Sequence, residues 1–186
     1  KTFSNSKIKG NSIPIFKSKE EELRGKLKNF SLPLIKKHFK LSDKLTDEVF
    51  NFYQKEEENV AAIELYEGIQ FKELKAEELS FKDNKAYIVS ALYGLLRPFD
   101  NTSKYRLDFN FKVLGNLYNY WKDDVKGYLE SNYKNELIIN LTSKEFHPLF
   151  KELDNVINIE FTSSNSKRLS SVLLKQLRGA MARVII

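Results

Sequence analysis

The chain has 186 residues, 41% hydrophobic and 13% aromatic, which predicts a folded globule and excludes a disordered tail. It contains no cysteine, so disulfides, a thiol nucleophile and cysteine metal sites are excluded, and its two histidines, His38 and His147, lie too far apart in sequence to suggest a metal centre. The net charge is +6 and no apolar run approaches the roughly 18 residues of a membrane-spanning helix, so we expect no membrane partner, no metal and no cofactor.

The first segment, residues 1–18, is rich in Lys, Ser and Asn, which predicts an extended or looped start. Ser18, followed three residues later by Glu21, fits a capping box and predicts that a helix begins there. A second, short helix is expected over Leu32–Phe39, because Pro33 is favoured in the first turn.

The next segment, LSDKL, predicts a turn, and Thr46 is expected to open a third helix through DEVFNFYQ. Two short helices joined by a tight polar turn resemble a helix-hairpin-helix, in which backbone N–H groups bind a phosphate. Lys40, Ser42 and Lys44 would lie at that turn. The pattern lacks a glycine-rich hairpin and also fits a packed helical hairpin without a ligand, so both interpretations stay open.

The later elements follow from hydrophobic spacing. They are helices over Ala61–Leu65 and Leu74–Leu79, a strand over Ala86–Ala91, a helix over Leu117–Tyr133, strands over Leu137–Leu141 and Val156–Phe161, and an amphipathic helix from about Ser166 to Val184. Gly179 inside this last helix costs about 1 kcal/mol against Ala, which predicts a close backbone approach.

These elements predict a mixed α/β (α+β) fold, a single compact domain over residues 1–186 with a central mixed sheet. Its helical, helix-hairpin-helix-like portion covers about 18–80, and its sheet and motif core about 86–186. The chain begins at Lys1, without Met, and has an apolar end, so we expect a piece of a longer protein.

The stretch SALYGLLRPFDNTSKYRLDF, residues 90–109, has the highest density of polar groups, and we call it the motif. Arg97 and Arg106 are the best candidates for binding, since a guanidinium holds phosphate or carboxylate through paired hydrogen bonds; the alternative is an internal salt bridge. Tyr93 and Tyr105 would either stack on a base or fill the core. Gly94 is expected to admit a close neighbour.

A second polar group, Asn140, Ser143 and Glu145, follows a predicted strand end, where sites in α/β proteins gather. Glu145 and Asp100 would then be an acid–base pair. The candidate catalytic residues are Tyr93, Arg97, Asp100, Tyr105, Arg106, Asn140, Ser143 and Glu145.

The charge is unevenly distributed along the chain. Residues 1–40 hold eleven Lys or Arg against three Glu, residues 41–160 fifteen against twenty-two acids, and residues 161–186 five bases and no acid. If the basic ends meet in the fold, they form one surface that favours polyanions; otherwise they are solubilising surface. The last helix would contribute a basic stripe of Lys175, Arg178 and Arg183.

Several segments together resemble one family, the YaaA peroxide stress proteins. They are Lys1-Thr2-Phe3, YEGI at 66–69, ALYGLLRPFD at 91–100, YRLDF at 105–109, LYNYW at 117–121, IINLTSKEF at 138–146 and RGAMARVII at 178–186. The chain departs from the family at 173–177, LLKQL, where only Lys175 keeps a base.

The resemblance implies a cytoplasmic protein of the hydrogen peroxide response, which binds double-stranded DNA through a basic cleft with a helix-hairpin-helix element and limits iron-dependent damage. The residues expected to bind DNA are Lys1, Lys40, Lys44, Arg97, Arg106, Lys175, Arg178 and Arg183. The alternative is an enzyme acting on a nucleotide, nucleobase or damaged nucleic acid around Arg97 and Arg106, with a nucleotide or phosphate as ligand. The sequence indicates no protein partner.

Overall fold

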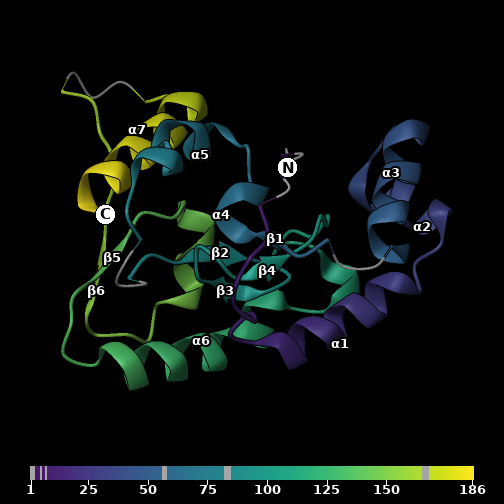
Figure 1. Cartoon of the computed structure of the whole chain (residues 1–186), viewed down its shortest axis with the longest axis horizontal. Helices are drawn as coiled ribbons and strands as arrows, with labels where there is room; N and C mark the ends of the chain where they lie inside the picture. The colour runs from purple at the N-terminus through teal and green to yellow at the C-terminus, as the bar shows by residue number, and fades with distance from the viewer. Residues whose placement is uncertain (1–2, 5, 7, 56–57, 82–84, 165–167) are drawn as a thin grey trace.

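A computed structural model describes residues 3–4, 6, 8–55, 58–81, 85–164 and 168–186. Its first half is largely helical (Figure 1). It contains α1 (Lys17–Lys28), α2 (Leu32–Phe39), α3 (Asp43–Gln54), β1 (Val60–Ala61), α4 (Ala62–Leu65), α5 (Ile69–Leu74) and the 3-10 helix η1 (Ala76–Glu78).

The second half mixes short strands with two long helices. Its elements are β2 (Ile88–Ser90), β3 (Gly94–Leu96), β4 (Asn101–Thr102), η2 (Lys112–Leu114), α6 (Leu117–Tyr133), β5 (Ile138–Asn140), η3 (Lys144–Leu149), β6 (Val156–Asn158) and α7 (Ser171–Ile185). The mixed fold class is thus confirmed.

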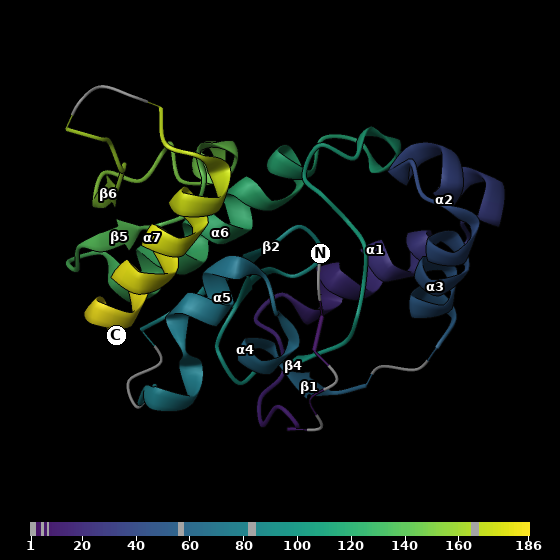
Figure 2. The ribbon, with the colours of Figure 1, turned by 90° about the horizontal axis from the view of Figure 1, so that it is seen from above.

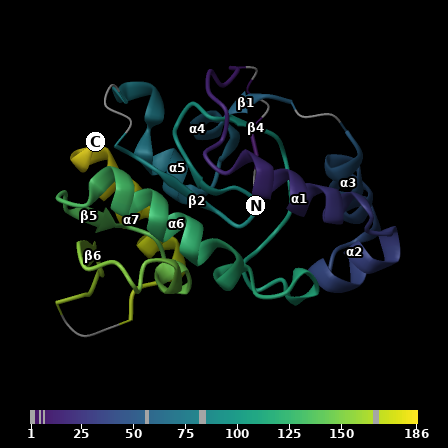
Figure 3. The ribbon, with the colours of Figure 1, turned by 90° about the horizontal axis from the view of Figure 1, so that it is seen from below.

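The strands do not form the expected central sheet. Among the described residues they form three separate pairs: β1 with β4 and β2 with β3 are antiparallel, and β5 with β6 is parallel. Each strand has two or three residues, too few to bring the pairs into one hydrogen-bonded ladder. The β5–β6 pair lies at the same end of the molecule as α6 (Figures 1 and 3).

The β2–β3 hairpin rests on α6 through Trp121, which is fully buried and donates its indole N–H to the Ala91 carbonyl at 2.9 Å. Gly94 begins β3 with a φ of 70°, and a Cβ there would lie 2.8 Å from the Trp121 ring. Gly94 therefore admits the close neighbour that the sequence predicted, and the motif is fixed against the core.

The last helix is held by a similarly close contact. A Cβ on Gly179 would lie 2.7 Å from the Glu73 Cβ and closer still to the Gln70 carbonyl oxygen, so α7 meets α5 backbone to backbone. This confirms the approach predicted from the glycine. Within the described part of the chain, no helix combines the length and the apolar character needed to cross a bilayer.

Several predicted helix boundaries were wrong. α1 begins at Lys17 after Phe16, whose ring packs on Trp121 at 5.7 Å, so Ser18 lies inside the helix and does not cap it. α3 begins at Asp43, and Thr46 lies in its first turn with its hydroxyl donating to the Ser42 carbonyl.

The expected helix over Leu74–Leu79 was also wrong. α5 ends at Leu74 and Lys75 turns left-handed, with a φ of 49°. Only the short 3-10 turn η1 follows.

Candidate nucleic-acid interface

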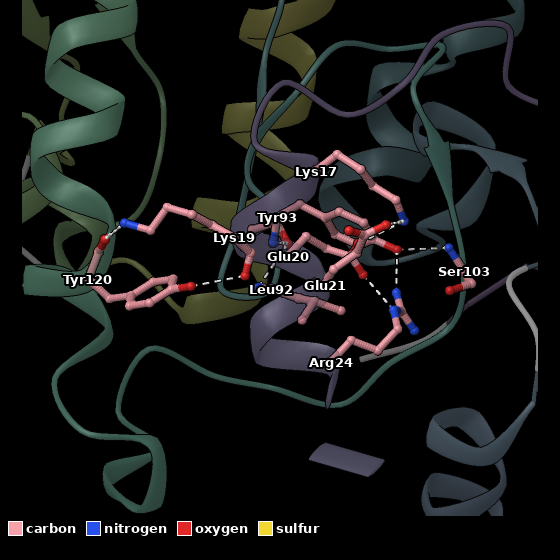
Figure 4. A network of polar contacts seen from close by, with 10 residues as sticks. Lys17, Lys19, Glu20, Glu21, Arg24, Leu92, Tyr93, Ser103 and Tyr120 are labelled. Carbon is pink, nitrogen blue, oxygen red and sulfur yellow. Dashed lines mark hydrogen bonds and ion pairs between the residues drawn. The ribbon is translucent and has the colours of Figure 1, made fainter. Parts of the chain in front are cut away.

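The two tyrosines of the motif lie in the core, and Tyr93 joins a buried polar network (Figure 4). The Tyr93 hydroxyl accepts from the Arg24 guanidinium at 2.8 Å and from the Ser103 N–H at 3.0 Å. Arg24 also donates to Glu20, a fully buried carboxylate on the same helix, and Lys17 lies 3.0 Å from that carboxylate. The Glu20–Arg24 pair on α1 is thereby hydrogen-bonded to Tyr93 in the motif.

Tyr105 belongs to a second chain of hydroxyls next to this network. It shares hydrogen bonds with the Ser90 hydroxyl at 2.8 Å and the Tyr66 hydroxyl at 3.1 Å, and its ring packs edge-on against Tyr93. Burial raises the pKa of Tyr93 to about 12 and that of Tyr66 well above its ordinary value of 10.0. Both phenols therefore stay protonated at neutral pH, and the geometry gives Tyr93 and Tyr105 a place in the core.

Arg97 forms the internal salt bridge with Asp100. Its Nε lies 3.0 Å from the Asp100 carboxylate, and its backbone N–H donates to the same carboxylate at 2.9 Å. The Ser12 hydroxyl also donates to this carboxylate, at 2.7 Å. Arg97 also donates to the Ile13 carbonyl at 2.6 Å. Asp100, fully buried, thus fastens the N-terminal segment to the motif.

The second polar group makes local contacts of its own. Asn140, buried at the end of β5, donates to Asn158 on β6 at 2.7 Å and accepts from the Thr142 N–H at 3.0 Å. Ser143 donates to Glu145 at 2.9 Å. Glu145 and Asp100 have different hydrogen-bond partners, and their action as an acid–base pair stays a prediction.

Arg106, in contrast, is half-buried and contacts residues from the helical half of the chain. Its carbonyl accepts the hydroxyl of Tyr53 on α3, and its guanidinium lies 5.8 Å from the centre of the Phe39 ring at the end of α2. Its Nε is buried and has no hydrogen-bond partner among the described residues. Phe39 in turn stacks on Phe111 at 4.5 Å. Arg106 therefore has donors available for a ligand.

Two of the predicted lysines lie close in sequence to the turn between α2 and α3, which follows Phe39. Lys40 caps α2 with a left-handed φ of 51°, and Lys44 lies in the first turn of α3. Within the described residues, neither lysine has a carboxylate partner. We call this set of residues the α2-end cluster: His38, Phe39, Lys40, Lys44, Arg106 and Phe111.

The groove between α2 and α3 is less suited to a phosphate. It has a volume of about 280 Å³, and Asp43 and Asp47 contribute to its lining. Asp43 also lies at the start of α3 and pairs with Lys36. Because a carboxylate already lies where a helix N-terminus would attract an anion, the cations of the turn are the stronger candidates for contact.

The basic stripe on α7 lies far from the α2-end cluster. Views from two directions place α7 at one end of the molecule and α2–α3 at the other (Figures 1 and 2), so the α2 part of the basic N-terminal region does not meet α7. Lys175 is exposed, Arg178 has a buried Nε without a partner among the described residues, and Arg183 pairs with Glu78. Lys1 lies outside the described residues.

The sequence did not point to several residues that shape these sites. Phe39 and Phe111 form the stacked platform, yet each looks in sequence like an ordinary core residue. Glu20 and Arg24 are spaced i, i+4 on α1, a signal that fits a surface pair as well as the buried one observed.

Comparison with known proteins identifies the family to which the chain belongs. The family model described as "Peroxide stress protein YaaA" matches residues 1–186. A UPF0246 protein of Finegoldia magna is 36% identical over 171 residues, covering 87% of this chain and 68% of the relative. A UPF0246 protein of Fusobacterium nucleatum is 33% identical over 199 residues, covering 99% of this chain and 79% of the relative. The chain therefore belongs to the YaaA family of peroxide stress proteins.

Proposed function

We propose that this chain binds duplex DNA in the cytoplasm as part of the response to hydrogen peroxide, and that binding limits iron-dependent damage. The observation that carries the proposal is the α2-end cluster. Arg106 lies over the ring of Phe39, which is distant from it in sequence and directly precedes Lys40. The buried Nε of Arg106 has no hydrogen-bond partner among the described residues. Such a group of cations around aromatic rings suits a phosphate backbone.

The charges of the cluster predict how binding depends on salt. Lys40, Lys44 and Arg106 would each neutralise one phosphate, and each neutralised phosphate contributes about −0.9 to the slope of log K against log salt. The expected slope is about −2.7. Affinity should therefore fall about 40-fold between 50 and 200 mM salt.

The test is fluorescence anisotropy of a labelled short duplex, about 8 base pairs long, across a salt series with wild type and Lys40→Gly. Lys40 is left-handed, and glycine removes the steric cost of that conformation, so the variant should gain about 1 kcal/mol in stability. It should also bind more weakly, with a slope reduced by about 1. Weaker binding by a more stable variant cannot be attributed to misfolding.

Lys134→Gln is the matched control, because Lys134 is an exposed lysine at the C-terminal end of α6. It removes the same charge and should leave both the affinity and the slope unchanged. Equal losses for the two variants would show that only net charge matters. Binding that does not change with salt would refute the proposal itself.

The alternative enzymatic function required the candidate catalytic residues to converge. They divide among separate local contacts: Tyr93 with Tyr105, Arg97 with Asp100, Ser143 with Glu145, and Asn140 and Arg106 apart from these. No observation favours that function over DNA binding.

A further inference from the structure

A pocket of about 580 Å³ lies between η3 and β6, and none of its lining residues that the structure describes belongs to the motif or to the α2-end cluster. Its volume falls within the range of small-molecule sites. Phe150 and Leu153, both largely buried, provide apolar surface together with Pro148 and Val156. The pocket is thus large enough, and apolar enough, for a planar organic group.

The polar side chains that line this pocket are mostly basic. They are Lys144, His147 and Lys151, and none of the lining residues that the structure describes is acidic. The Nε2 of His147 is buried and has no hydrogen-bond partner among the described residues. Lys151 is exposed and has no carboxylate partner in the same part of the chain. An anion with several oxygens would satisfy both groups.

Three acids close to the lining residues in sequence are already engaged. Glu160 lies 2.8 Å from Lys144, and that hydrogen bond is the main reason its pKa is lowered, with a smaller effect from the charge of His147. Glu152 pairs with Lys122 and Lys126, and Glu145 accepts from Ser143. Because the Lys144–Glu160 pair is largely exposed, it is worth little and leaves Lys144 able to contact a ligand.

Asn158 gives the pocket a directional polar group at its β6 side. Its side-chain oxygen accepts from Asn140 at 2.7 Å, so its amide NH₂ remains to donate to an acceptor on a ligand. A nucleobase offers such acceptors at the edge of a planar ring, and a phosphate monoester offers the oxygens that the cations require.

We propose that this pocket binds a nucleoside monophosphate. The phosphate lies among Lys144, His147 and Lys151, and the base lies against Pro148 and Phe150 with an edge toward Asn158. A phosphate monoester offers enough oxygens to accept from both lysines and from His147, because the exposed Lys144–Glu160 pair leaves Lys144 able to contact it. This site is independent of the DNA interface proposed above.

The test uses the fact that the chain has two histidines, one at each site. Imidazole NMR signals are followed while adenosine 5′-monophosphate, adenosine, inorganic phosphate or the short duplex is added. The monophosphate should move the His147 signal and leave His38 in place, and its affinity should exceed that of adenosine or phosphate by at least tenfold. The duplex should move His38 alone.

Three outcomes would overturn the proposal. The first is no movement of His147 with the monophosphate. The second is an equal response to inorganic phosphate, which would leave no role for the base. The third is displacement of the monophosphate by the duplex, which would assign the pocket to the nucleic-acid interface. Failure of the duplex to bind, with the monophosphate still bound, would refute only the DNA proposal.

Variants test which side chains hold the phosphate. Lys151→Gln changes an exposed residue and should fold normally. Loss of its charge-assisted hydrogen bond should weaken monophosphate binding about tenfold or more. Lys134→Gln, the same change elsewhere on the surface, should leave affinity unaltered. Equal affinity of wild type and the Lys151 variant would contradict the placement of the phosphate.

Discussion

Replacing Gly179 by alanine tests how α7 is held in place. A Cβ at this position would lie 2.7 Å from the Glu73 Cβ and closer still to the Gln70 carbonyl oxygen. The Gln70 carbonyl oxygen belongs to the backbone of α5, so it cannot rotate away as a flexible side chain can. The two helices must therefore separate, and we expect Gly179→Ala to destabilise the protein.

The magnitude follows from two opposing effects. Overpacking costs up to about 3 kcal/mol, and a backbone obstruction favours that upper end. Alanine regains about 1 kcal/mol of helix propensity. The net loss is about 2 kcal/mol, which for a chain of this size lowers Tm by about 4–8 °C.

Gly127→Ala is the control. Gly127 lies inside α6, and a Cβ there has no neighbour within 4 Å among the described residues. The same substitution should therefore gain about 1 kcal/mol. Thermal and urea unfolding followed by circular dichroism measure both effects, and hydrogen exchange should show faster opening of α7 in Gly179→Ala. Stabilisation by both substitutions would refute the close α5–α7 contact.

Other predictions concern the buried polar groups of the motif. Tyr93→Phe leaves the Arg24 guanidinium and the Ser103 N–H without their acceptor and should destabilise the fold by about 1–3 kcal/mol in urea unfolding. The pKa of Tyr93 is raised from 10.0 to about 12 in the folded protein, so the unfolded chain loses the hydroxyl proton at a lower pH. The free energy of unfolding should therefore decline between about pH 10 and pH 12, and it should decline less steeply in Tyr93→Phe. Arg97→Ala leaves the buried Asp100 carboxylate without its cation and should lower the free energy of unfolding by about 3 kcal/mol. Adding Asp100→Asn should recover part of that loss. If the Arg97 variant binds DNA with unchanged affinity at a temperature where it is folded, Arg97 is excluded from the interface.

Elements with strong local signals could be predicted from the sequence. The ends of α2 and α6 agree with the prediction, because α2 has an early proline and α6 has a long apolar period that begins after an Asn cap. Gly94 and Gly179 were informative for a related reason. A glycine inside a helix or next to a strand is unfavourable, which favours a neighbour that excludes a Cβ. Gly94 and Gly179 have such a neighbour, whereas Gly127 inside α6 has none within 4 Å among the described residues, so the glycine alone does not identify the contact.

Non-local contacts could not be predicted in the same way. The strand pairs have two or three residues each, so their register has no periodic pattern to identify it. Arg106 contacts the ring of Phe39, which lies 67 positions earlier in the sequence, and no local sequence pattern around either residue indicates this contact. Composition showed that the motif carries many polar groups, but only coordinates distinguish the salt bridge of Arg97 from the Arg106 guanidinium, whose Nε has no hydrogen-bond partner among the described residues.

The separation of the two basic surfaces leads to a last prediction. A compact chain of 186 residues is about 40 Å across, and DNA advances about 3.4 Å per base pair, so a duplex must exceed about 12 base pairs to contact both ends. A duplex of about 8 base pairs should give a salt slope of about −2.7, from the α2-end cluster alone. A duplex of about 20 base pairs would add Lys175 and Arg178 and steepen the slope to about −4.5. Lys175→Glu should then weaken binding of the long duplex only, since the short one cannot reach α7 from the cluster. Equal slopes for both lengths would exclude α7 from the interface, because a contact that neutralises a phosphate must release counterions wherever it forms.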